Sequence, residues 1–221
     1  MSAGSSHARI LIVDDDQGAV LVLSQRLSSW GYEVLTAPSG EEALRVVEEV
    51  RPDLVLLDVM MPGMDGWEVL RRMKADPATR SIPVAMLTVL HLSEEIIKKK
   101  DIAGLVDYIF KPFTREGLVG KVGHIIALSS EAQEKKEKLA AVNKEMAAEY
   151  EDVCNCMMLH ENIKGAVEKI LKEKREAGFI KDILGYQDFL QTESELVQRY
   201  EKRKEEIERL LVPKGKETRG T

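Results

Sequence analysis

The 221-residue chain has only two cysteines, Cys154 and Cys156, and a single residue separates them. Two thiols this close along the chain cannot form a disulfide framework, so the sequence predicts a cytoplasmic protein with reduced thiols. No hydrophobic run approaches the roughly 18 residues of a membrane-spanning helix, and residues 1–8 lack the apolar stretch of a secretory signal. We therefore expect neither membrane association nor export.

Positive charge is not in excess either. Lys and Arg number 32 against 38 Asp and Glu, which gives a net charge of -6 and a pI of about 5.4. Such a chain has no strong positive field for a phosphate backbone, which disfavours nucleic acid as a main partner. With 44% hydrophobic residues and only 15 Gly and 7 Pro, a wholly disordered chain is excluded.

The character of the chain changes near Leu128. From there on it has a single proline, Pro213, and 38 of its 94 residues are charged, against 32 of the first 127. The total length suits one large domain or two small ones. We predict an α/β domain over residues 8–127, an α-helical hairpin or coiled coil over 128–212, and a disordered tail over 213–221.

Five short aliphatic or β-branched runs alternate with five amphipathic segments in the first part. The runs are 9–13, 33–37, 53–59, 82–87 and 107–110, and the amphipathic segments are 19–30, 41–50, 67–75, 93–100 and 115–127. Ser39 and Ser93 each precede a pair of glutamates, which is typical of helix starts. The alternation predicts a doubly wound α/β fold, with a five-stranded parallel sheet between two layers of helices.

The second part carries helical heptads. Eight of the ten seam positions in the first register are apolar, which favours a coiled coil or a helical hairpin. Those positions are Leu139, Val142, Met146, Glu149, Val153, Cys156, His160, Ile163, Val167 and Ile170. A weaker register runs from Ile183 to Leu211, so we predict two long helices folded back on each other. The sequence leaves open whether they pair within one chain or between chains.

Carboxylates stand where two predicted strands end. Asp14 and Asp15 follow the first strand, and Asp58 ends the third. Ligands of open parallel sheets bind outside the carboxyl ends of the strands. Clustered carboxylates repel each other unless a cation lies among them, and an all-oxygen set suits Mg²⁺. The alternative is that the aspartates after the strands are turn or cap residues. This alternative fits Asp16, the next residue in the chain, better than it fits Asp14, Asp15 or Asp58.

Thr88 ends the fourth predicted strand and Lys111 follows the fifth. A metal ion, an ammonium group and a hydroxyl around one carboxylate are what phosphoryl transfer to that carboxylate needs, because the reaction depends on positioning and charge neutralisation. With Asp58 as the nucleophile, this set predicts a phosphoacceptor site.

Taken together, these motifs resemble the receiver domain of two-component response regulators. The matching stretches are Ile10–Asp15, Asp53–Gly66, Thr88 and Asp107–Phe113. The resemblance implies a flavodoxin-like sheet with strand order 2-1-3-4-5. It also implies a phosphoacceptor signalling protein, rather than an enzyme with a separate substrate, whose Asp58 takes a phosphoryl group from a sensor histidine kinase.

The resemblance also implies how a magnesium ion would be held. Asp15 would bind Mg²⁺ directly and Asp14 chiefly through water, with Asp58 and the backbone carbonyl of Met60 as further ligands.

Further implied roles concern the phosphoryl group. Thr88 and Lys111 would contact its oxygens, and the Lys111–Pro112 peptide bond would be cis. Tyr108 would turn inward when Thr88 moves toward the phosphoryl group; the alternative is a half-buried aromatic at a strand edge. Met60, Val89 and Leu90 are apolar or larger than the family pattern, so we expect slow self-dephosphorylation.

The helical part has neither a helix-turn-helix with a basic face nor a glycine-rich nucleotide loop. We therefore expect it to act through self-association, as a homodimer, or by docking on a partner protein, including an enzyme regulated in trans. A sharper alternative is a phosphorelay through His160, which precedes Glu161 on a predicted helix. A structural histidine on the heptad seam is favoured, and a metal site with the nearby cysteines lacks ligands.

Overall fold

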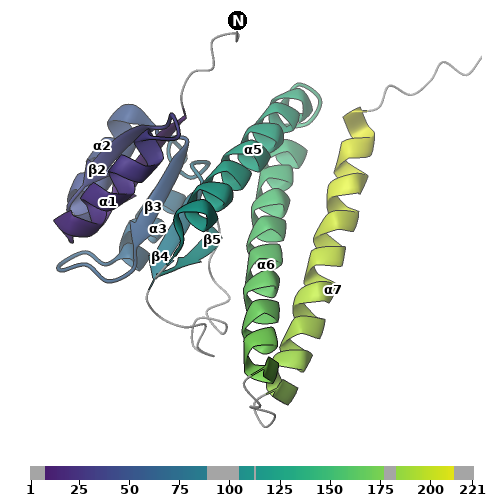
Figure 1. The fold of residues 1–221 in the computed structure, drawn as a ribbon. Coiled ribbons are helices and arrows are strands. Elements are labelled where there is room, and N and C mark those ends of the chain that lie inside the picture. Colours follow the sequence, from purple (N-terminus) through teal and green to yellow (C-terminus); the bar gives the residue numbers. More distant parts are fainter. Residues whose placement is uncertain (1–7, 89–104, 112, 177–182, 212–221) are drawn as a thin grey trace, which may run out of the picture.

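The computed structural model describes residues 8–88, 105–111, 113–176 and 183–211 (Figure 1). Five strands and seven helical segments make up this part of the chain. They are β1 (Arg9–Val13), α1 (Gln17–Ser28), β2 (Glu33–Ala37), α2 (Gly40–Val50), β3 (Leu54–Asp58), α3 (Gly66–Ala75), β4 (Val84–Thr88), β5 (Leu105–Phe110), α5 (Arg115–Ala140), α6 (Lys144–Glu176), α7 (Ile183–Glu208) and the 3-10 helix η1 (Arg209–Leu211). The helix predicted at 93–100 lies outside the described residues.

The five strands form one parallel sheet with the order β2-β1-β3-β4-β5, which confirms the predicted flavodoxin-like topology. One face packs against α1 and α5, the other against α2 and α3. Because both faces are covered, residues 10–13 and 54–57 are completely buried, which explains their unbroken apolar sequence. Val13 pairs with Leu57, so the residues that follow them, Asp14 and Asp58, reach the same edge of the sheet.

Side-chain caps fix the starts of several helices. Asp16 accepts hydrogen bonds from the backbone N–H groups of Gly18 and Ala19, so α1 begins at Gln17, earlier than predicted. Ser39 caps α2 in the same way, as expected. The loop after β3 ends at Asp65, whose carboxylate caps α3. These caps place the segments around the strand ends in defined positions.

The prediction that the helix after β5 ends at Ala127 is wrong. Helix α5 continues to Ala140 and passes through the predicted boundary at 127/128. The segment beyond 127 has no glycine or proline, and Lys135 and Lys138 form ion pairs four residues back, with Glu131 and Glu134. Such pairs support a helix on its exposed side.

The first heptad register is also wrong at its start, because it crosses a helix break. Leu139 belongs to α5, whereas Val142 lies in the turn before α6 and is 67% exposed. The side chain of Asn143 accepts hydrogen bonds from the N–H groups of Glu145 and Met146 and thereby starts α6. The second register agrees with the structure from Leu190 to Leu211, where the seam positions are buried or half-buried.

The two long helices pair within one chain. Helices α6 and α7 stand side by side, and the last turns of α5 join them (Figure 1). A small core of Leu139, Tyr150, Cys154 and Ile207 lies among the three helices. Ion pairs such as Arg203–Glu149 and Lys135–Glu208 cross between them. In the part of the chain that is described, no helix is both long and apolar enough for a membrane span.

Helix α6 also packs along β5, the outer strand of the sheet. Its buried residues Leu159, Val167 and Leu171 belong to the same apolar cluster as Leu105 and Tyr108 of β5. This contact could not be predicted from the sequence, because a heptad pattern indicates that a helix face is buried and not which element buries it.

Candidate functional site

Three predicted residues meet at the carboxyl end of the sheet. The Nζ atom of Lys111 lies 2.7 Å from Asp14 Oδ2 and 2.7 Å from Asp58 Oδ1, so one ammonium bridges both carboxylates. Asp14 is 3% exposed, whereas the side chains of Asp58 and Lys111 are partly accessible. The arrangement leaves the nucleophile predicted at Asp58 within reach of solvent.

The protonation of Lys111 follows from its two partners. Burial disfavours the ammonium form, but the hydrogen bonds to Asp14 and Asp58 outweigh that effect and raise the pKa of Lys111. The lysine is therefore charged at neutral pH and supplies the positive charge of the site.

Backbone groups of Met60 and Gly66 contact Asp58 and hold it in place. The N–H of Met60 donates to Asp58 Oδ2 over 2.8 Å. Gly66, at the start of α3, lies against the backbone oxygen of Asp58 so closely that a Cβ at this position would overlap with it. From the sequence alone Gly66 is only one residue of the stretch that resembles the family, and its place directly after the cap Asp65 is the signal for this role.

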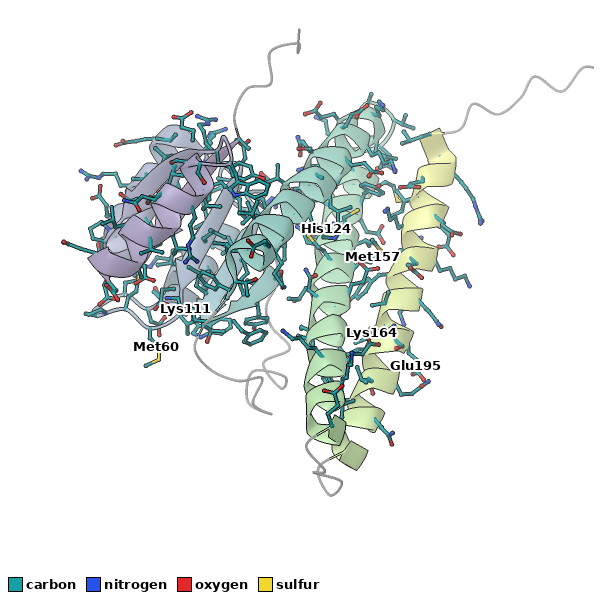
Figure 2. The ribbon with its side chains drawn as sticks, in the orientation of Figure 1. Met60, Lys111, His124, Met157, Lys164 and Glu195 are labelled. Carbon is teal, nitrogen blue, oxygen red and sulfur yellow. The ribbon has the colours of Figure 1, made fainter. Side chains whose placement is uncertain are left out.

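The remaining predicted residues surround this centre. Asp15 is exposed next to Asp14, and Thr88 is buried at the end of β4. The backbone N–H of Lys111 donates to the carbonyl of Thr88 over 2.7 Å, which links the ends of β4 and β5. Met60 is 67% exposed, and Figure 2 shows it close to Lys111 at the same end of the sheet. Val89, Leu90 and Pro112, with its predicted cis bond, lie outside the described residues.

The donor set suits a hard cation. No three His, Cys, Asp or Glu side chains within the described ranges form a complete metal site. Mg²⁺ rarely needs one, because it binds through one or two carboxylates and keeps several waters. Lys111 joins Asp14 to Asp58, exposed Asp15 follows Asp14 in the chain, and the backbone of Met60 contacts Asp58, so the donors that these residues offer are oxygens. These residues fit Mg²⁺.

Tyr108 lies fully inside the protein rather than half-buried at the strand edge. It is 2% exposed, and its ring centroid is 6.4 Å from that of Trp67 and 6.3 Å from that of Phe110. Its buried hydroxyl has no hydrogen-bond partner within the described segments. Burial raises the pKa of Tyr108, so the phenol is neutral.

His160 contacts helix α7. Its Nδ1 lies 2.6 Å from Oε2 of the buried Glu193 on α7, and its ring stacks on Tyr200 at 5.6 Å. Asn162, two residues later, points instead to β5. These contacts match the favoured interpretation of a structural histidine.

The neighbouring thiols are free. Cys154 is buried and Cys156 half-buried, and burial raises the pKa of both. Thiols in this state are poor nucleophiles and behave as small apolar groups.

The fold and the site define a class of protein, and comparison with known families agrees. A family model described as the response regulator receiver domain matches residues 10–123, just over half of the chain, and the chain belongs to this family. Response regulator PleD of Caulobacter vibrioides is 44% identical over 115 residues, which are 52% of this chain and 25% of PleD. The chain thus spans about a quarter of the length of that relative.

Two solved structures extend the comparison. The chemotaxis protein CheY4 of Vibrio cholerae is 32% identical with a TM-score of 0.51, and the match covers 54% of this chain and 99% of that one. The receiver domain of sensor histidine kinase PA1611 from Pseudomonas aeruginosa is 31% identical with a TM-score of 0.51, over 55% of this chain and 99% of that one. The latter has a magnesium ion coordinated in its active-site cleft.

Proposed function

We propose that this protein is a response regulator whose Asp58 accepts a phosphoryl group from the phosphohistidine of a sensor histidine kinase, with Mg²⁺ as cofactor. The main support is the Lys111 ammonium that bridges Asp14 and Asp58. In the transfer an oxygen of Asp58 forms a bond to phosphorus while the phosphorus–nitrogen bond of the donor breaks, and the imidazole leaves. The chemistry needs positioning and neutralisation of charge more than acid or base groups.

Each residue of the site contributes to that positioning. The N–H of Met60 holds one carboxylate oxygen of Asp58, and Lys111 lies on the other, ready to contact a phosphoryl oxygen. Thr88, tied to Lys111 through the backbone, would bind a second phosphoryl oxygen. Asp14, Asp15, Asp58 and the Met60 carbonyl would hold Mg²⁺, which supplies positive charge to the transferring group.

Phosphorylation by a small donor tests the proposal. The chain is incubated with acetyl phosphate and MgCl₂, and the aspartyl phosphate is followed by phosphate-affinity electrophoresis. Asp58→Asn should abolish uptake, as should EDTA. Asp16→Asn is the matched control and should retain uptake, since asparagine also caps helices well. Equal uptake by Asp58→Asn and its parent would refute the assignment.

We also propose slow self-dephosphorylation. The exposed side chain of Met60 next to Asp58 is apolar where a polar group could orient an attacking water. The phosphorylated protein should persist for minutes or longer after the donor is removed. A half-life of seconds would contradict this proposal.

The helical part is proposed to carry the output through protein contacts, at a cytoplasmic location consistent with the free cysteines. Since α6 and α7 pair within the chain, docking on a partner protein is better supported than helix exchange in a homodimer. Multi-angle light scattering with and without beryllofluoride separates the two: an unchanged monomer mass supports a partner, and a dimer that forms on addition supports self-association. The relay through His160 stays an untested alternative.

A further inference from the structure

The outer strand β5 is covered by the protein's own helical hairpin. Asn162 Nδ2 on α6 donates to the carbonyl of Val106 over 3.2 Å. Leu159, Val167 and Leu171 of the same helix are buried in the apolar cluster that contains β5. Helix α6 therefore contacts both a backbone carbonyl and apolar side chains of the outer strand.

Helix α7 reinforces the contact. Phe189 and Leu190, close to its start, pack against the same cluster as α6. Near the other end of the interface, Glu151 and Asp152 of α6 act electrostatically on the half-buried Lys74 of α3. Continuous α5 tethers the hairpin to the sheet, so its effective concentration at β5 is high.

Tyr108 links this contact to the acceptor site. It is one of the two residues of β5 that are fully buried in the shared cluster, and it lies on the strand that leads to Lys111. Its hydroxyl is buried without a partner in the described part of the chain, which is unfavourable by itself. The inward position of the ring therefore depends on the packing of the apolar cluster to which Leu159, Val167 and Leu171 of the hairpin also belong.

We propose that the α6–α7 hairpin is a built-in ligand of the β5 face, which holds Tyr108 inward and thereby favours phosphorylation of Asp58. The inference rests on the proposed function and on the predicted response of Tyr108, which would turn inward when Asp58 is phosphorylated. Hairpin docking and phosphorylation both favour the state in which Tyr108 lies inward, so each makes the other more favourable by the same factor. Hairpin docking and phosphorylation are thus positively coupled, the opposite of a hairpin that phosphorylation releases.

Affinity for a phosphoryl mimic measures the coupling. Beryllofluoride with Mg²⁺ is titrated into the full chain, and binding is followed by the fluorescence of Trp67, which neighbours Tyr108. Leu159→Ala/Asn162→Ala weakens the docking and should lower the affinity at least about fivefold, the lower end of typical coupling between sites. Lys169→Ala, on the exposed side of α6, is the matched control and should leave the affinity unchanged.

Hydrogen exchange supplies the reciprocal measurement and checks folding. Beryllofluoride should slow amide exchange in α6 of the parent protein, and the double variant should retain its helical circular dichroism. If beryllofluoride instead speeds exchange in α6, or binds the double variant as tightly as the parent, the coupling is refuted while the proposed function stands. If the parent and Asp58→Asn respond equally to beryllofluoride, both proposals fail.

A double-mutant cycle tests whether the hairpin acts on beryllofluoride binding through Tyr108. In a Tyr108→Ala background, Leu159→Ala/Asn162→Ala should no longer change the affinity for beryllofluoride, because the coupled group is absent. A fivefold loss that persists in this background would show that the hairpin does not act through Tyr108 and would overturn the proposal.

Discussion

Within the described residues, Lys111 is the only cation that joins Asp14 to Asp58, and its raised pKa keeps it charged. It neutralises the two carboxylates, and under the proposed function it would also contact the phosphoryl group on Asp58. Replacement of Lys111 should therefore affect phosphoryl transfer and Mg²⁺ binding in different ways.

Lys111→Met should slow phosphorylation of Asp58 by acetyl phosphate at least about tenfold, since loss of one charged contact to a transferring group costs one or more factors of ten. Mg²⁺ affinity should be unchanged or higher, because the carboxylates lose their competing cation. Phosphate-affinity gels give the rate, and Mg²⁺-dependent quenching of tryptophan fluorescence gives the affinity. Lys138→Met, on the exposed side of α5, serves as the control. Weaker Mg²⁺ binding in Lys111→Met would contradict this account.

Gly66 is required by contact rather than by backbone angle. Gly66→Ala would force a Cβ into the backbone oxygen of Asp58, so we expect a loss of about 1–3 kcal/mol in the free energy of unfolding and slower phosphorylation. Gly120→Ala is the comparison, because open space surrounds that position in helix α5 and alanine should stabilise by about 0.5–1 kcal/mol. Urea unfolding checks both values, and equal stability of the two variants would contradict the contact.

Helix α3 ends in a half-buried cation, Lys74. The Nζ of Lys74 donates to the carbonyls of Arg80 over 2.9 Å and Ile82 over 2.6 Å. Burial lowers its pKa to about 8, although Glu151 and Asp152 of α6 oppose the shift. An unfolded lysine keeps its ordinary value, so between pH 8 and about 10.5 the unfolded chain binds more protons than the native one.

The free energy of unfolding should accordingly gain a contribution from Lys74 as pH rises through this range, and lose it as pH falls through 8. Lys74→Met removes the titrating group. The free energy of unfolding of the parent should therefore rise relative to that of the variant from pH 8 to 10. Urea titrations across that range isolate the effect, because other groups cancel in the difference. A difference that is flat or shrinks with pH would contradict the lowered pKa.

Much of the receiver part could be predicted from the sequence. Strands at 9–13 and 33–37 agree with the structure, and Asp14, Asp58 and Lys111 meet as expected. Local patterns suffice there, because strand ends in a parallel sheet converge. The docking of α6 could not be predicted, since Asn162 and Leu159 show their partners only in three dimensions. The break at Asn143 carries only a weak signal in the sequence, an asparagine two residues before Glu145, and neither glycine nor proline.

The receiver sheet and the helical bundle share one apolar cluster, which joins residues of α2, α3, β5 and α6. Both tryptophans, Trp30 and Trp67, lie in the receiver part, whereas most helical residues lie in α5, α6 and α7. Fluorescence and circular dichroism therefore report on different parts of the molecule.

The whole molecule should unfold as one cooperative unit, with urea transitions by tryptophan fluorescence and by circular dichroism at 222 nm that coincide. Leu159→Ala should lower the free energy of unfolding obtained from either signal by about 2–5 kcal/mol, as expected for a buried leucine on a shared surface. Val142→Ala, at an exposed turn, is the comparison and should change neither. Separate transitions, or a shift in the helical signal alone, would mean that the two parts fold independently.

Helix α5 begins next to the acceptor site and ends inside the bundle, without interruption across its 26 residues. At 1.5 Å per residue it is a rod of roughly 39 Å, so a tilt of about 5° at its start displaces its far end by roughly 3 Å. Lys121 anchors the near end through its 2.6 Å ion pair with the buried Asp107. Small motions around β5 are thus magnified mechanically at the tip of the molecule, with no flexible joint to absorb them.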